Sequence, residues 1–324
     1  MRFINAVTFG FMSPRGFSRG QQWRESLKLM ATETSCDTVV LAVAALQDHA
    51  YSTQVDYLAD DIMGAEDIRT VSAFAKELGL RVILKAMVNC RDGYWRAYIR
   101  FFDNPVPTEP TWNEWFESYG RFVLAMAQSA QEAGAEMLCV GCEMVGTDHR
   151  EHEWRSLIMA VRRQYQGVIT YNCDKYQEEH VRWWDAVDVI SSSGYYPINA
   201  LTANLSRIRK VTDEAGKPFM FMESGCPSRE GSEYLPNDWR FTGRQSLQAQ
   251  ERWYRAVTEE MILNPWIRGI AWWDWSADNL YNREKAHGDN GYCIYGKPAA
   301  MVVKAFSQQI YGRDTSLKTG ETEA

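Results

Sequence analysis

Short apolar runs of strand length alternate with longer segments of helical periodicity along this chain. Residues 66–78 show the helical period directly, because five apolar side chains fall on one face: Ile68, Val71, Phe74, Ala75 and Leu78. Eight runs rich in β-branched and apolar residues predict strands at 4–11, 38–47, 81–89, 137–146, 168–173, 188–196, 218–225 and 267–275. This alternation is typical of βα units around a parallel sheet.

The spacing of the strands selects one architecture among the α/β folds. Eight strands over about 270 residues give roughly 34 residues per unit, the size of a βα repeat in a closed barrel. A doubly wound sheet usually has a glycine-rich first turn, and the chain contains no G-x-G-x-x-G or P-loop motif. The pattern therefore predicts a single-domain (β/α)8 TIM barrel over residues 1–312, followed by a polar, disordered tail over 313–324.

Composition and charge exclude several classes of protein. The 324 residues are 45% hydrophobic and 24% charged, as in folded globular chains. A net charge of -7, without a basic run, argues against a nucleic-acid partner. No apolar stretch reaches the roughly 18 residues that cross a bilayer, and no signal peptide is visible. Seven cysteines in apolar segments do not resemble a disulfide framework, so we expect a cytoplasmic protein without a membrane partner.

Glutamates end two of the predicted strands, at Glu143 in the fourth and Glu223 in the seventh. The catalytic residues of a TIM barrel lie at the C-terminal ends of its strands. Period-two alternation puts Glu143 on the side of Gly141 and Glu223 on the side of Phe221. If those sides face inward, both acids converge over the barrel mouth. The alternative for each glutamate is an ion pair within the scaffold, because an unpaired charge in an apolar strand costs free energy.

A pair of carboxylates across a cleft is the machinery of glycoside hydrolysis. One acid protonates the leaving oxygen, while the other attacks the sugar or activates water. A separation of about 5 to 5.5 Å favours retention and about 6.5 to 9.5 Å favours inversion. Glu143 and Glu223 are therefore the candidate catalytic residues.

Aromatic residues gather at the ends of three predicted strands. Trp273 and Trp275 share one face of the eighth strand by period two. Tyr195 and Tyr196 end the sixth strand, and Trp95 follows the third. Aromatic rings at a cleft stack on the apolar faces of sugars, so these five are candidate substrate contacts. Most of the 13 tryptophans lie in helical stretches, where a core position is expected.

Competing chemistries have weaker signals. His149 and His152, followed by Glu153, lack the H-E-x-x-H spacing of a zinc site, so we expect no metal. Cys139 and Cys142 form a C-x-x-C on a strand, where their side chains are expected to face opposite ways as small buried hydrophobes. We expect no cofactor.

A series of short motifs runs along nearly the whole barrel, from about residue 4 to 312. The motifs are Leu84-Lys85, Asp92-Gly-Tyr-Trp95-Arg96, Trp115-Phe-x-x-Tyr119, Gly141-Cys-Glu143, Trp154-x-x-Leu157-Ile with Val161-Arg162, Gly167-x-Ile-Thr-Tyr171, Tyr195-Tyr-Pro197, Glu223-x-Gly225 and Gly296-Lys-Pro298-Ala. In their order and spacing they resemble the retaining β-glycosidase clan of TIM barrels and, more narrowly, glycoside hydrolase family 113, the β-mannanases.

This resemblance implies a function and a set of residue roles. It implies hydrolysis of β-mannosidic oligosaccharides by double displacement, with Glu143 as acid/base and Glu223 as nucleophile. It also brings Lys85 and Arg96, together with the strand-end aromatic residues, into the substrate-binding site. Two alternatives stay open: the same mechanism on a gluco, xylo or amino-sugar β-linkage, and a catalytically silent barrel that only binds glycans.

The chain departs from the clan pattern beside its acid/base. The clan commonly has an asparagine there that holds the sugar 2-hydroxyl, whereas this chain has Cys142, a poor hydrogen-bonding substitute. We expect Asn172 or Asn89 to take over that contact. Ala86-Met87 replaces the Pro-His that typically follows the strand-three lysine, which removes a polar group near the cleft.

Overall fold

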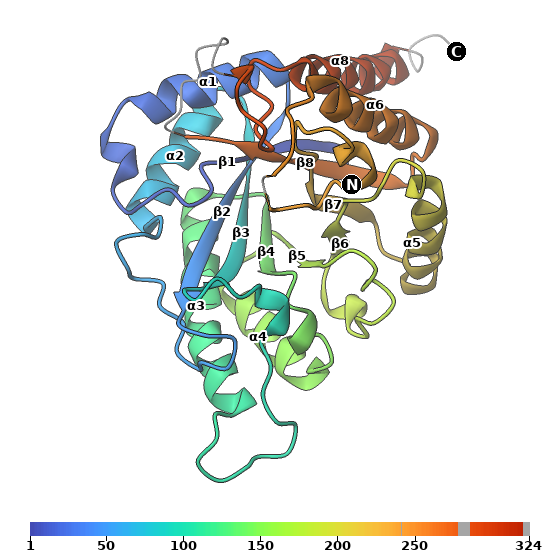
Figure 1. Ribbon diagram of the computed structural model, residues 1–324. Helices are drawn as coiled ribbons and strands as arrows, with labels where there is room; N and C mark the ends of the chain where they lie inside the picture. Colours follow the sequence, from blue (N-terminus) through green and yellow to red (C-terminus); the bar gives the residue numbers. More distant parts are fainter. Residues whose placement is uncertain (241, 278–285, 320–324) are drawn as a thin grey trace.

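Eight parallel strands close into a barrel in chain order, and helices surround it (Figure 1). The computed structural model describes residues 1–240, 242–277 and 286–319. The strands are β1 (Ile4–Phe9), β2 (Thr38–Gln47), β3 (Arg81–Cys90), β4 (Met137–Cys142), β5 (Val168–Cys173), β6 (Val189–Ser193), β7 (Phe219–Ser224) and β8 (Ile267–Trp275). The predicted TIM barrel is confirmed.

The helices lie between consecutive strands and after the last one. They are α1 (Gln22–Thr34), α2 (Ala65–Glu77), α3 (Trp112–Ala133), α4 (Glu151–Gln164), α5 (Leu201–Ala215), α6 (Leu247–Leu263) and α8 (Pro298–Thr319), with short 3-10 turns η1 (Phe17–Arg19), η2 (Arg96–Tyr98), η3 (Val145–Thr147), η4 (Trp184–Ala186) and η5 (Ser232–Tyr234). Helix α2 buries Ile68, Val71 and Phe74, as its periodicity predicts. Helix α8 continues through residues 313–319, where an irregular tail was expected, and residues 320–324 lie outside the described part of the chain.

Two apolar layers hold the barrel together. The larger one packs the outer face of the strands against the helices. The smaller one fills the inside of the barrel with side chains from several strands: Ile4, Ala6, Val40, Ile83, Met137, Cys139, Val189, Met220, Met222 and Ala271. Lys85 follows Ile83 by two residues, so alternation aims it into the barrel one layer nearer the C-terminal ends of the strands. The polar side chain of Lys85 therefore lies next to the inner apolar layer, on the side of the C-terminal strand ends.

A β-bulge re-aims the end of β4. Cys139 pairs with Thr170 and Cys142 with Asn172, so three steps on β4 oppose two on β5. Cys139 and Cys142 consequently both face the barrel interior, and the expectation that they face opposite ways is wrong. Gly141 faces outward instead, because a Cβ there would lie 2.8 Å from the Trp154 ring. Glu143 therefore does not share its side with Gly141.

Bulges also displace the ends of β7 and β8. On β7, Phe221 packs in the outer layer, while Glu223 reaches the interior. Phe221 and Glu223 pair with the consecutive residues Ser192 and Ser193 of β6, so β7 has one extra residue at this point. On β8, Trp272 and Trp275 oppose Val7 and Phe9, so three steps oppose two. Strict alternation fails at the C-terminal ends of these strands, where the predicted site lies.

Several strands end earlier than the sequence predicts, and two of these ends matter for the site. Strand β4 ends at Cys142, so Glu143 follows the strand rather than lying within it. Strand β6 ends at Ser193, which places Tyr195 in the following loop. Among the described residues, no helix is both long and apolar enough to cross a membrane. All seven cysteines are buried and free.

Candidate active site

Glu223 lies inside the barrel mouth, 3% exposed, and is surrounded by hydrogen-bond donors. The Lys85 ammonium, from the interior face of β3, forms an ion pair with Oε2 of Glu223. The hydroxyl of Tyr195 donates to Oε1 at 2.6 Å. The thiol of Cys142 donates weakly to Oε2 at 3.6 Å. The two carboxylate oxygens are therefore held from different parts of the chain: Oε2 from β3 and β4, and Oε1 from the loop after β6.

These donors determine the ionisation of Glu223. Burial by itself raises the pKa of Glu223, but the charge and hydrogen bond of Lys85, the Tyr195 hydroxyl and the charge of Arg96 outweigh it, so the pKa lies below its usual value. Burial likewise opposes the charged form of Lys85, yet its neighbours Cys142 and Glu223 leave the pKa of Lys85 raised. The pair is therefore a buried carboxylate and a buried ammonium at neutral pH.

Glu143 sits directly after β4 and is held differently. Its backbone takes φ 54°, a left-handed conformation uncommon outside glycine, and its N–H donates to the Asn172 carbonyl at 2.8 Å. Arg96 donates to Oε2 of the carboxylate at 2.7 Å, and Trp95 Nε1 donates to the same oxygen at 3.3 Å. The Ser193 hydroxyl donates to Oε1 at 2.7 Å. Three side-chain donors thus fix one carboxylate.

The two glutamates approach each other through their shared neighbours. Cys142, the residue before Glu143, has its sulfur 3.6 Å from the Glu223 carboxylate. Asn172 donates to the same sulfur at 3.3 Å and to Ser193, the partner of Glu143, at 3.1 Å. The structure therefore brings the two predicted carboxylates into one polar cluster at the C-terminal ends of the strands.

The other predicted polar residues divide between this cluster and its edge. Asn172 is fully buried within the cluster. Asn89 is only partly buried, and its Oδ1 accepts from Arg96 at 2.8 Å. Arg96 also donates to the Val88 carbonyl at 2.9 Å, so its guanidinium is fixed on three sides. Asn89 therefore acts on Glu143 through Arg96.

Three of the five predicted aromatic residues lie at the site. Tyr195 contacts Glu223, and Trp95 contacts Glu143 while remaining 40% exposed. The Trp273 ring lies 5.7 Å from the Lys85 ammonium and forms an edge contact with Phe11 at 4.7 Å. Tyr195 and Trp273 therefore lie on the Glu223 side of the cluster, and Trp95 lies on the Glu143 side.

Tyr196 and Trp275 were predicted at the site, and the structure places them in the outer layer. The Tyr196 hydroxyl donates to Glu178 at 2.7 Å, outside the barrel mouth. Trp275 donates to Ser26 on α1 at 3.1 Å and packs in the same outer core. For Trp275 the physical reason is the β8 bulge, and for Tyr196 it is alternation with the inward-facing Tyr195.

Sequence reasoning missed several residues at the mouth. Trp239, from the loop between β7 and α6, is 44% exposed and stacks on Tyr292 with ring centroids 4.3 Å apart. It also forms edge contacts with Tyr195 at 5.9 Å and Trp273 at 6.2 Å. Its loop, one of the longest in the chain, was the available signal. Ser193, at the end of β6, was likewise not among the predicted site residues.

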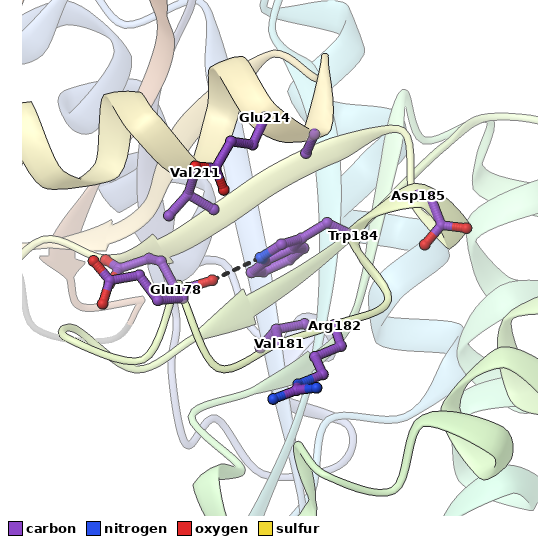
Figure 2. A pocket seen from close by; sticks show the side chains of 9 residues that line it. Glu178, Val181, Arg182, Trp184, Asp185, Val211 and Glu214 are labelled. Atoms are coloured by element: carbon purple, nitrogen blue, oxygen red, sulfur yellow. Dashed lines mark hydrogen bonds between the residues drawn. The ribbon is translucent and has the colours of Figure 1, made fainter.

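A separate hollow of about 310 Å³ lies outside the barrel, between segment 178–185 and α5 (Figure 2). Trp184 forms its wall and donates to the Glu178 carbonyl at 2.8 Å. Its lining contains none of the predicted site residues. Across the described ranges, no group of three or more metal-ligating side chains comes together. His149 instead pairs with Asp103 at 2.8 Å.

A closed barrel with two buried glutamates at the ends of its strands defines a class of enzyme. The chain is a glycoside hydrolase, and its expected substrate class is an oligosaccharide. It belongs to glycoside hydrolase family 113, whose sequence model matches residues 7–297. The resemblance noted in the sequence is thereby confirmed.

Solved structures agree with the family. The chain is 47% identical to a GH113 beta-1,4-mannanase solved as a complex, covering 95% of this chain and 99% of that one with a TM-score of 0.93. It is 42% identical to the GH113 beta-mannanase AaManA from Alicyclobacillus acidocaldarius in complex with ManMIm, covering 96% and 98% with a TM-score of 0.91. A beta-glucuronidase from Ruminococcus gnavus, at 15% identity, 94% and 50% coverage and a TM-score of 0.63, shares the fold alone. None of the curated proteins matches the chain.

Proposed function

We propose that this chain hydrolyses β-1,4-linked mannooligosaccharides with retention of configuration, using Glu223 as nucleophile and Glu143 as acid/base. The observation that carries the proposal is the unequal setting of two buried glutamates joined by one polar cluster. The β-mannanase names of the similar structures support the choice of sugar.

In the first half of the reaction, Glu223 attacks the anomeric carbon. Its lowered pKa keeps the carboxylate ionised, as a nucleophile requires. Glu143 gives its proton to the glycosidic oxygen as the bond to the leaving sugar breaks. The products of this step are a glycosyl ester on Glu223 and an ionised Glu143.

In the second half, the roles of Glu143 reverse. The ionised carboxylate takes a proton from water, whose oxygen attacks the anomeric carbon and displaces Glu223 as a carboxylate. Lys85 and Tyr195 both donate to Glu223, so they stabilise the negative charge as it returns to that leaving group. Two displacements at one carbon restore the original configuration.

Asn172 is the candidate reader of the sugar 2-hydroxyl. Its amide nitrogen is used by Ser193 and Cys142, while its Oδ1 has no hydrogen-bond partner among the described residues. A buried acceptor without a partner costs free energy, so a substrate hydroxyl that donates to Oδ1 gains by filling it. Asn89, whose Oδ1 already accepts from Arg96, has less to offer.

The test compares the products formed from β-1,4-mannopentaose by the wild-type protein and by Glu223→Ala, followed by chromatography over time. We expect cleavage by the wild type and a rate lower by about 10⁴-fold or more in the variant, because the covalent step is lost. Glu178→Gln is the matched control, since Glu178 is equally buried but contacts Tyr196 and Arg207 outside the mouth. It should retain activity.

Two outcomes contradict this proposal in different ways. Cleavage of gluco, xylo or amino-sugar β-glycosides but not of mannosides contradicts the proposed substrate and agrees with the proposed mechanism. Binding without turnover on every sugar supports the silent barrel instead. We also propose a cytoplasmic location, supported by the seven free cysteines and tested by cell fractionation.

A further inference from the structure

Asn172 stands between the two glutamates, and its side-chain nitrogen donates in two directions. One hydrogen bond reaches Oγ of Ser193 at 3.1 Å, and the other reaches Sγ of Cys142 at 3.3 Å. Ser193 contacts Glu143, and Cys142 contacts Glu223. A continuous hydrogen-bonded path therefore connects the two carboxylates through three buried side chains.

The direction of each hydrogen bond follows from counting protons. A serine hydroxyl has one proton, and an ionised carboxylate only accepts. Ser193 therefore donates to Oε1 of Glu143, and its oxygen accepts from Asn172. If the amide of Asn172 were flipped, its Oδ1 would compete with Glu143 for that single proton.

The branch through Cys142 follows the same rule with weaker groups. The thiol proton points to Oε2 of Glu223 at 3.6 Å, and the sulfur accepts from Asn172. Sulfur is a weak donor and a weak acceptor, so this branch contributes less than the hydroxyl branch. The amide of Asn172 thus fixes the orientation of the Ser193 O–H bond and of the Cys142 S–H bond, each of which points to a different glutamate.

We propose that Asn172, Ser193 and Cys142 form a positioning relay in which the Asn172 amide holds the Ser193 hydroxyl on the acid/base Glu143 and the Cys142 thiol on the nucleophile Glu223. The relay rests on the proposed roles of the two glutamates and extends them to three residues that do not touch the reacting bond through these contacts. Hydrogen bonds in such a chain polarise one another, so the two branches together hold both carboxylates in fixed orientations.

Several other charged groups surround the relay and act on the same glutamates. Arg96 from η2 and Trp95 before it hold Oε2 of Glu143. Asp174, which follows β5, lies near Glu143, and burial together with that charge raises the pKa of Asp174 to about 7.

The remaining groups lie on the Glu223 side. Lys85 from β3 and Tyr195 from the loop after β6 both contact Glu223, and the charges of Glu143 and Glu223 act on Tyr195 and Cys142 as well. The test of the relay must therefore separate the effect of Ser193 from that of Asp174.

The test measures kcat/KM against pH for Ser193→Ala on β-1,4-mannopentaose and on an aryl β-mannoside with an activated leaving group. Loss of the hydroxyl removes a donor from ionised Glu143, so the basic limb of the profile should move up by about one pH unit. Activity on the oligosaccharide should fall by about tenfold, and activity on the aryl substrate much less, since it needs little acid catalysis.

Ser192→Ala is the matched control. Ser192 is the preceding residue of β6 and is equally buried. It pairs with Phe221, which packs in the outer layer, and its hydroxyl has no hydrogen-bond partner among the described residues. Its profile should match the wild type. Ser193→Cys retains the size of the side chain with a weaker donor, so it should shift the basic limb in the same direction by less. This second variant tests the relay if Ser193→Ala does not fold.

Two further variants complete the test. Cys142→Ala should move only the acidic limb, upward and by less than Ser193→Ala moves the basic one, because its branch serves Glu223 through a weak donor. The double variant Asp174→Asn, Ser193→Ala should show the same shift of the basic limb as Ser193→Ala does alone. The shift then comes from loss of the Ser193 hydroxyl and not from Asp174.

The outcomes distinguish the relay from the proposed function. Unchanged limbs in both Ser193 variants, with equal losses on both substrates, overturn the relay and leave only a packing role. Glu143→Gln is assayed in parallel. If Glu143→Gln loses more activity on the oligosaccharide than on the aryl substrate and Ser193→Ala does not, only the relay is rejected. If Glu143→Gln loses activity equally on both substrates, the acid/base role of Glu143 is rejected together with the relay.

Discussion

The settings of Glu223 and Glu143 differ although both are buried glutamates at the barrel mouth. Glu223 is enclosed within the barrel by Lys85 and Tyr195. Glu143 directly follows β4, its backbone is in the left-handed conformation, and one of its carboxylate oxygens accepts a hydrogen bond from the partly exposed Trp95. An enclosed, ionised carboxylate suits attack on a carbon held close to it. A carboxylate nearer solvent suits exchange of a proton with the leaving group and then with water.

The variant Glu143→Gln tests the acid/base role of Glu143 and should have a larger effect than changes at the residues around the two glutamates. We expect kcat/KM on β-1,4-mannopentaose to fall by about 10³-fold, because general acid catalysis is lost. An activated aryl β-mannoside should lose less than about tenfold in its first, burst phase, since its leaving group departs without a proton. Stopped-flow release of the aryl group measures this difference. Equal losses on the two substrates would give Glu143 a different role.

The second prediction concerns the charge that holds Glu223. In Lys85→Met, burial continues to raise the pKa of Glu223 while its largest opposing influence is gone, so that pKa rises. The nucleophile must be ionised, so the acidic limb of kcat/KM should move to higher pH, with a loss of about 10²-fold at neutral pH. A pH profile together with thermal unfolding checks it. An acidic limb at the wild-type position in a folded variant would contradict the effect of Lys85.

The bulges explain how far the sequence could predict this site. The resemblance brought Lys85 into the predicted site, and alternation along β3 accounts for its inward position, because β2 and β3 pair in register over their full length. Position at strand ends selected Glu143 and Glu223, while alternation assigned Gly141 and Phe221 to the wrong face. A bulge depends on the pairing of two strands far apart in the chain, so single-strand periodicity does not contain it.

Contacts that depend on tertiary packing were harder to predict than the strands themselves. Ser193, at the end of β6, becomes a functional candidate only through its hydrogen bond to Glu143, since a serine on a strand carries no chemical signal by itself. Trp239 comes from the loop after β7, whose path follows from tertiary packing rather than from local pattern. The fold was therefore predictable from periodicity, and the residue types at the strand ends indicated the chemistry.

The third prediction compares two adjacent tyrosines. Tyr195→Phe removes a donor to Glu223, and we expect kcat to fall by about tenfold. Tyr196→Phe should leave kcat and KM unchanged while lowering the free energy of unfolding by about 1–3 kcal/mol, because buried Glu178 loses a partner. Steady-state kinetics and chemical denaturation of both variants decide it. A kinetic defect in Tyr196→Phe would contradict its position in the outer layer.

The smallest effect is expected at the exposed rim, where neither glutamate is touched directly. Trp239 stacks on Tyr292 and turns its edge to Trp273, and its exposed face is available to a sugar ring. Stacking on such a ring contributes about 1 kcal/mol, so Trp239→Ala should raise KM for mannopentaose by about fivefold with little change in kcat. Tyr234→Ala is the control, because Tyr234 is an exposed aromatic residue of the same loop. If both variants raise KM equally, loop rigidity rather than the Trp239 ring sets the affinity. If only Trp239→Ala does so, the rim contributes binding and the two glutamates beneath it contribute the chemistry.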